Sequence, residues 1–124
     1  MNTRTLLSGI AALFLATGAA HAASIKANHW AALCTSNMEK EVLMCGFYAI
    51  GLVDGLTLWK ANSTDPINFC LPEDGKGEVL VSVKQIVEVG LAYIQKQKTP
   101  ESNFRAIAVV LREAIEEKWP CIGM

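Results

Sequence analysis

The sequence predicts an all-α fold, a small disulfide-stapled bundle of about four helices preceded by a cleaved signal peptide. Two segments in the second half of the chain have apolar residues at helical spacing, and an earlier segment is apolar on all sides. With 124 residues, of which 52% are hydrophobic, the chain is long enough for one small domain. A net charge of -1 without a basic stripe argues against nucleic acids and anionic membrane surfaces as partners.

Residues 1–22 are typical of a secretory signal peptide. Arg4 gives a positive start, an apolar stretch of about 15 residues begins at Leu6, and the small-x-small triplet Ala20-His21-Ala22 marks a cleavage site. The stretch is shorter than the ~20 residues that a membrane-spanning helix needs. We therefore predict a signal peptide over residues 1–22 and a single exported domain over residues 23–124.

The chain has four cysteines, and export to an oxidising compartment favours disulfides for such an even set. A zinc site is not indicated, because there is no Cys-x-x-Cys pair and a single histidine follows the signal peptide. Of the three possible pairings we favour Cys34–Cys45 with Cys70–Cys121. The first pair brackets a predicted helix-turn-helix, and the second ties the central loop to the C-terminus.

A short first helix is predicted over residues 25–33. Thr35-Ser36-Asn37 marks the turn that follows, and Asn37 is the expected N-cap of a second helix. Glu39 and Glu41 then fall in the first turn of that helix, where negative charge is favourable.

The second helix continues through Val42–Trp59, a segment in which Asp54 is the only charge. Its apolar residues surround the helical wheel, which is typical of a helix that is buried on all sides or spans a membrane. We favour a buried helix and expect no membrane insertion, because Asp54 and the glycines oppose insertion. Gly51 and Gly55 share a face that would serve core packing or a dimer interface equally well. For Asp54 we favour a structural role, accepting hydrogen bonds from helix ends, over binding a partner's cation.

Residues 61–77 are predicted to form a surface loop, because turn signals such as Asp65-Pro66 recur along them. A third helix is predicted over residues 81–97. Polar and apolar residues alternate weakly over residues 78–83, as in a strand, but we interpret this segment as leading into the helix. Its expected core stripe is Val83, Ile86, Val87, Gly90, Leu91 and Ile94, and Val89 and Tyr93 widen the apolar arc. The surplus edge is either a contact surface or part of an enclosed core.

A fourth helix is predicted from the break at Thr99-Pro100-Glu101, capped by Thr99 or Ser102, as far as Trp119. Pro120 ends it. The expected inward residues are Phe104, Ile107, Ala108, Leu111, Ala114, Ile115 and Trp119. The expected outward residues are Arg105, Arg112, Glu113 and Glu116.

The sequence does not predict an enzyme. His29 is the only histidine after the signal peptide, and no nucleophile motif surrounds any serine or cysteine. Adjacent acids such as Glu116-Glu117 point away from each other on a helix. Gly75-Lys76-Gly77 lacks the spacing of a phosphate-binding loop. We expect no catalytic residues, no cofactor and no metal.

Several short motifs occur together between residues 33 and 121. An aromatic-x-x-Gly-x-x-Asp segment follows a cysteine at Tyr48, Gly51 and Asp54, the central loop contains Phe69-Cys70-Leu71-Pro72, and the chain closes in Trp119-Pro120-Cys121. With these motifs the chain resembles the Rap/Tai family of type VI secretion amidase-immunity proteins. It departs from the family in its longer segment before Gln85 and in Trp119, where phenylalanine is commoner.

The resemblance implies a small helical periplasmic protein, often a homodimer, that binds a peptidoglycan-cleaving amidase effector and occludes its active site. Such protection against self or sibling intoxication needs no catalysis. The residues that match the motifs are scaffold residues: Tyr48, Gly51, Asp54, Gly55, Pro72, Trp119 and Pro120. From exposure and shape we expect the partner to contact the loop 95–102 and the outer side of the third helix. The expected contact residues are Gln85, Glu88, Gln95, Lys96, Lys98 and Glu101.

Two other functions stay open at this point. One is a periplasmic chaperone of the acid-stress kind, or another exported helical protein with a binding role, which the apolar helix would suit. The other is an enzyme that uses His29.

Overall fold

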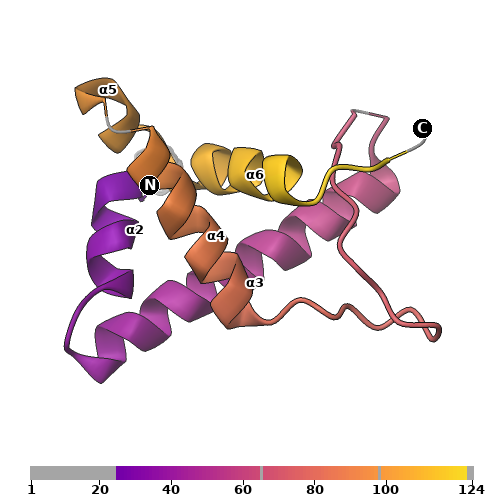
Figure 1. Cartoon of the computed structure of the whole chain (residues 1–124), viewed down its shortest axis with the longest axis horizontal. Coiled ribbons are helices and arrows are strands. Elements are labelled where there is room, and N and C mark those ends of the chain that lie inside the picture. Colours follow the sequence, from indigo (N-terminus) through magenta and orange to yellow (C-terminus); the bar gives the residue numbers. More distant parts are fainter. Residues whose placement is uncertain (1–24, 65, 98, 123–124) are drawn as a thin grey trace, which may run out of the picture.

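The computed structural model describes residues 25–64, 66–97 and 99–122, so the predicted signal peptide lies outside the described residues. Within these ranges the chain is helical and forms no strand. The helices are α2 Ala27–Cys34, α3 Glu39–Asn62, α4 Val83–Lys96, α5 Pro100–Asn103 and α6 Ile107–Lys118. In Figure 1, α3 is the long diagonal helix, and α2 and α6 flank α4. The all-α class is confirmed, with one helix more than expected.

The core is built around Trp30 of α2. Its side chain is fully buried, together with Cys45 of α3 and Ile107, Leu111 and Ile115 of α6. The indole Nε1 donates a hydrogen bond to the carbonyl oxygen of Cys45, at 3.3 Å. Burial of this donor is therefore matched by an acceptor from a neighbouring helix.

α3 begins later than the predicted cap. Met38 is its N-cap residue and makes no side-chain capping hydrogen bond, so the prediction of Asn37 as N-cap is wrong. The Ser36 hydroxyl accepts instead from the Met38 backbone N–H, at 3.0 Å. A serine side chain that turns back onto the backbone two residues on competes with a cap for the same stretch of chain. Glu39 and Glu41 do lie in the first turn, as expected.

α3 is not buried on all sides, which corrects the second prediction for this helix. It presents Cys45, Ala49 and Val53 to the core, while Phe47 and Leu58 are 68% and 66% exposed. The other helices of the described chain are too few and too short to surround a helix of 24 residues, and α2 and α4 cover one side of it. By length and composition α3 is also the one helix of the described chain that could cross a membrane, a test that core helices also pass.

Asp54 and the two glycines lie on the uncovered side of α3. Asp54 is exposed and enters none of the hydrogen bonds or ion pairs found among the described residues, so its predicted structural role is wrong. A Cβ atom added to Gly51 or Gly55 would meet nothing within 4 Å. These glycines therefore do not serve the packing of this core.

α4 begins at Val83, with Ser82 as its N-cap. Ser82 and Gln85 form a reciprocal capping box, in which the Gln85 N–H donates to the Ser82 hydroxyl and the Ser82 N–H donates to the Gln85 side-chain oxygen. The described residues before it, 63–64 and 66–82, are irregular apart from an isolated bridge between Glu73 and Val79. The loop predicted over residues 61–77 thus begins two residues later than expected, and α4 begins two residues later than the predicted third helix. Of the predicted core stripe, Ile86 and Gly90 are buried and the rest are half-buried.

Gly90 is the point of closest approach between α4 and its neighbours. A Cβ atom at this position would lie 2.7 Å from Cδ1 of Leu111 and 2.9 Å from Cη2 of Trp30. Real Cβ atoms do not come so close to other heavy atoms, so only glycine lets α2, α4 and α6 meet here without a shift. The absence of a side chain at residue 90 thus sets the spacing of three helices.

The predicted fourth helix is two helices with a corner between them. α5 starts with a capping box between Thr99 and Ser102, but the chain leaves the helix at Phe104 and re-enters it at Ile107. At the corner, residues 25–27 pair with residues 105–107: the Ala27 N–H donates to the Arg105 carbonyl and the Ile107 N–H donates to the Ile25 carbonyl, both at 2.9 Å. Phe104 is 65% exposed at this corner, so its predicted inward position is wrong. Val110 is buried where Ala108 was expected.

Both predicted disulfides are formed, Cys34–Cys45 and Cys70–Cys121, and no described cysteine is free. The first joins α2 to α3 close to the core. The second joins the segment between α3 and α4, which we call the central connection, to the end of the chain. There the Cys70 N–H also donates to the Trp119 carbonyl at 2.8 Å. The C-terminal segment after α6 is thereby held against the connection that follows α3, as Figure 1 shows.

Candidate interaction surfaces

A cleft of about 470 Å³ opens between α4 and α6, and we call it the α4–α6 cleft. Three of the six predicted contact residues, Gln85, Glu88 and Lys96, line it together. The other lining residues are Val89, Ala92, Tyr93, Ala114, Glu117, Lys118 and Trp119. The cleft thus combines an apolar floor with charges of both signs.

The charges at the cleft are loosely held. Lys96 of α4 and Glu117 of α6 form an ion pair of 2.7 Å across the opening, and both side chains are more than half exposed. Glu88 is 3.9 Å from Lys84, again between exposed side chains. Exposed pairs of this kind contribute little to stability. These side chains can therefore leave their present ion pairs and pair with charges of a docking protein, at little cost to the stability of the fold.

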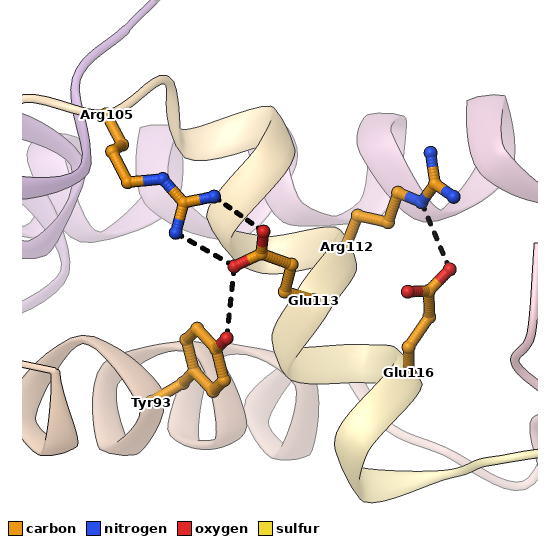
Figure 2. Close-up of polar contacts among 5 residues, drawn as sticks. All are labelled: Tyr93, Arg105, Arg112, Glu113 and Glu116. Atoms are coloured by element: carbon orange, nitrogen blue, oxygen red, sulfur yellow. Dashed lines mark hydrogen bonds and ion pairs between the residues drawn. The ribbon is translucent and has the colours of Figure 1, made fainter. Parts of the chain in front are cut away.

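One wall of the cleft is fixed by a polar cluster, drawn in Figure 2. Arg105 donates to both carboxylate oxygens of Glu113, at 2.9 Å and 2.5 Å, and the Tyr93 hydroxyl donates to Glu113 Oε2 at 3.0 Å. Two parallel bonds from a guanidinium are a strong and oriented form of ion pair. The cluster ties α4, the α5–α6 corner and α6 together, so Tyr93 is held in place at the cleft.

The same cluster shifts two pKa values. The hydrogen bond from Arg105 lowers the pKa of the Glu113 carboxyl below its ordinary value, more than partial burial raises it. Burial raises the pKa of Tyr93, and the hydrogen bond to Glu113 adds to the rise. At neutral pH Glu113 is thus an anion and Tyr93 a neutral donor, which is the pairing that the geometry requires.

Arg105 and Glu113 were expected to point outward as solvated charges. The sequence analysis missed their pairing because it placed both residues on one continuous helix. On such a helix, residues eight apart are separated by more than two turns and do not come into contact. Arg112 and Glu116, four apart on α6, do pair at 3.1 Å, which ordinary helical spacing allows (Figure 2).

The remaining predicted contact residues lie elsewhere. Gln95 is on the other edge of α4, where it lines two shallow pockets, one with residues of α5 and one with residues of α2. Glu101 is exposed on α5, and Lys98 lies outside the described residues. The structure therefore divides the predicted contact set between two surfaces.

A second candidate surface is the uncovered side of α3, which we call the α3 outer face. It comprises Met44, Phe47, Gly51, Asp54, Gly55 and Leu58, all of which are exposed. Near its C-terminal end, Gly55 and Leu58 also line an open pocket with residues 59 and 62–64. A large exposed apolar patch on a protein surface usually marks an interaction site.

His29 is an exposed residue of α2. Its backbone N–H donates a hydrogen bond to Oδ1 of Asn28, at 2.9 Å. Across the part of the chain that the structure describes, no three His, Cys, Asp or Glu side chains lie close enough to hold a metal ion. The candidate sites that follow from the described residues are thus the two surfaces named above.

The family model for Rap1a immunity proteins matches residues 26–121. The chain belongs to the Rap1a immunity protein family. The match covers both candidate surfaces and both disulfides, and it confirms the resemblance seen in the motifs. Searches of curated proteins and of solved structures gave no match. Membership in the Rap1a family indicates an immunity role, in which a non-enzymatic inhibitor binds a partner effector protein.

Proposed function

We propose that this Rap1a family member is a periplasmic protein that binds a peptidoglycan amidase effector of the type VI secretion system and occludes its active site. The family match over residues 26–121 is the observation that carries this proposal. Two disulfides support a protein that works after export to an oxidising compartment. Occlusion needs a surface and no reactive groups of its own.

The α4–α6 cleft is our candidate for the effector-binding surface. Its rim offers both charge signs and an amide, from Glu88, Lys96 and Gln85, above an apolar floor. Specific interfaces combine these features, with an apolar centre and a polar rim. A standard interface buries ~800 Å² on each partner, so the effector would extend beyond the cleft onto the neighbouring turns of α4 and α6.

The α3 outer face is our candidate for a homodimer interface. Two copies of α3 that cross antiparallel about a two-fold axis near Gly51 would place Phe47 of one copy opposite Gly55 of the other. Met44 would then meet Leu58. A large side chain opposite a glycine allows close packing, and Asp54 would stay at the edge of the contact. This arrangement gives a use to the glycines, which the monomer core does not use.

The test of the function is protection from a cognate toxin. The product of the neighbouring reading frame is exported to the periplasm of a host with and without the full-length protein, and lysis and co-purification are scored. We expect lysis without the protein, and survival with a stable complex in its presence. The proposal fails if no exported amidase is bound or neutralised.

The cleft is tested in the same assay by charge reversal. The double variant Glu88→Lys with Lys96→Glu should lose the complex and the protection, because both charges lie on the cleft rim. The matched control is the double variant Lys76→Glu with Glu78→Lys, which reverses two exposed charges that do not line the cleft. Full protection by the cleft variant would place the effector elsewhere, and loss with the control variant would show that the effect is not specific to the cleft.

A second candidate function is favoured by the α3 outer face itself. A chaperone of the acid-stress kind would use this apolar strip to hold unfolded proteins once acid separates two copies. It predicts that the monomer suppresses aggregation of unrelated proteins at about pH 3, where carboxylates are protonated. A dimer that stays intact at that pH would exclude this function.

A further inference from the structure

The two disulfides lie in different surroundings. Cys45 is 1% exposed and belongs to the core, so a reagent in water meets the Cys34–Cys45 bond only from its outer side. Cys70 is exposed, and it lines an open cleft of about 510 Å³ with Lys60 and residues of the central connection. Because Cys70 is an exposed residue at an open cleft, we expect a thiol in solution to reach Cys70–Cys121 without unfolding the domain.

The ammonium group of Lys60 lies close to both sulfurs of this disulfide. The Lys60 ammonium is 3.4 Å from Cys70 Sγ and 3.6 Å from Cys121 Sγ. It also donates a hydrogen bond to the Phe69 carbonyl oxygen and lies 5.2 Å from the centre of the buried Phe69 ring. Three kinds of contact thus hold the last turn of α3 and its charge at the disulfide.

We propose that Cys70–Cys121 is a thiol-exchange site that reacts with dithiols, and that Lys60 is a positioning residue which stabilises the departing thiolate. Thiol–disulfide exchange proceeds through a thiolate leaving group, and the reaction is faster when that thiolate is more stable. An adjacent ammonium favours the thiolate form of a cysteine. The Cys34–Cys45 disulfide has no cation recorded against its sulfurs among the described residues, so the two bonds should react differently.

The reaction balances as follows. One thiol of the dithiol, as a thiolate, attacks the exposed Cys70 sulfur, a mixed disulfide forms, and the Cys70–Cys121 bond breaks. Cys121 leaves as a thiolate beside the Lys60 ammonium. The second thiolate of the dithiol then attacks the sulfur of its own molecule and releases Cys70. The dithiol is oxidised to a disulfide, the protein disulfide gains two electrons, and the protons lost by the dithiol end on the two cysteines or in water.

The test follows each disulfide separately in the full mature protein. The oxidised protein is exposed to dithiothreitol, samples are quenched with an alkylating agent, and mass spectrometry of the peptides reports which bond has opened. In the wild type, Cys70–Cys121 should open first. Lys60→Gln should slow that opening about three- to tenfold, because the leaving thiolate loses its cation. Lys60→Arg should restore most of the rate, and Lys76→Gln, an exposed lysine of the central connection, should not change it.

The direction of the effect separates this role from a structural one. Lys60 also holds the Phe69 carbonyl, so a variant that merely loosened the structure would open Cys70–Cys121 faster, and this result would overturn the proposal. Equal rates for the two disulfides, or an unchanged rate with Lys60→Gln, would also overturn it. In a Cys70→Ser background, alkylation of Cys121 should reach its half-maximal rate at lower pH when Lys60 is present than in Lys60→Gln. Identical pH profiles would contradict the role of Lys60.

Discussion

At the scale of single residues, the spacing of the helices in the core depends on the absence of a Cβ atom at residue 90. Gly90 is a poor helix residue, yet α2, α4 and α6 meet over it at distances that no Cβ atom tolerates. The sequence places Gly90 on the core face of its helix. Nothing in the local sequence says that Trp30 and Leu111 are the residues that fill the gap, because both come from distant parts of the chain.

Gly90→Ala should therefore destabilise the protein. The new methyl group would collide with Leu111 and the stiff ring of Trp30, and overpacking of this kind costs about 1–3 kcal/mol of unfolding free energy even though alanine favours helix. Urea denaturation measures the change. The control is Gly46→Ala, also within a helix, where an added Cβ atom would lie at an ordinary contact distance of 3.5 Å from Val83 Cγ1, so the stability should be unchanged or slightly higher. Equal effects of the two substitutions would contradict the role of Gly90.

Glu113 gives the protein a pH-dependent contribution to stability. Its pKa in the folded state is lower than its ordinary value of 4.5, chiefly because of Arg105. A group with a lowered folded pKa stabilises the fold above its unfolded pKa, and this contribution fades as the pH falls below about 4.5. Glu113→Gln should lower the Tm by a few degrees at neutral pH, on the order expected for a partly exposed pair.

The measurement is the Tm of wild type and Glu113→Gln across a pH series. The difference between them should be largest near neutral pH and should shrink on acidification, since the wild-type carboxyl then loses its charge. Glu117→Gln is the control, because Glu117 lies in a more exposed pair. A difference that is constant from pH 7 to pH 3 would contradict the assignment.

At the scale of elements, the sequence predicts helices well where the apolar stripe is narrow. α2 and α4 lie within two residues of their predicted bounds. The position of α3 was predicted correctly, but its burial on all sides was not. In a helix that is apolar all round, the sequence does not indicate which side meets the core. The break between α5 and α6 contains no glycine or proline. It is imposed by the pairing of residues 105–107 with residues 25–27, about 80 positions away, and local patterns cannot register such a contact.

The α3 outer face yields a prediction on oligomeric state. We expect a dimer in sedimentation equilibrium, and Leu58→Glu should convert it to a monomer, because a charge would be buried in the proposed contact. Phe104→Glu is the matched control, an equally exposed apolar residue at the α5–α6 corner. A wild type that is monomeric at all concentrations would contradict the dimer, and a wild type that sediments with lipid vesicles would assign the face to membranes.

At the scale of the whole molecule, the sequence anticipated part of the candidate site. Gln85 and Glu88 were predicted as contact residues from the outer side of one helix, and Lys96 from the contact loop 95–102; all three line the α4–α6 cleft. The opposite wall, with Glu117, Lys118 and Trp119, was missed as a site. It comes from a helix that the sequence locates but does not orient, and the relative placement of two helices depends on distant residues such as Gly90 and Arg105.

The two disulfides should contribute unequally to the stability of the whole domain. Cys70–Cys121 closes a loop with a sequence separation of 51, and Cys34–Cys45 one of 11. On the loop-entropy model the longer loop stabilises by about 4 kcal/mol and the shorter by about 3 kcal/mol. Cys70→Ser should thus cost somewhat more than Cys34→Ser in urea denaturation. A melting curve that is the same with and without reductant would contradict both values.

The pairing of residues 25–27 with residues 105–107 also determines the order in which the domain can be completed as the exported chain enters an oxidising compartment. If the chain enters from its N-terminal end, α2 and α3 come first, and these two can pair and close the Cys34–Cys45 ring by themselves. The indole of Trp30 must wait for Gly90 and Leu111, and the backbone of Ile25 must wait for Ile107. A chain interrupted before α4 is therefore a helical hairpin with its central tryptophan in water, and one interrupted before α6 still lacks Leu111 beside that ring. The first helix becomes native only when the last one arrives.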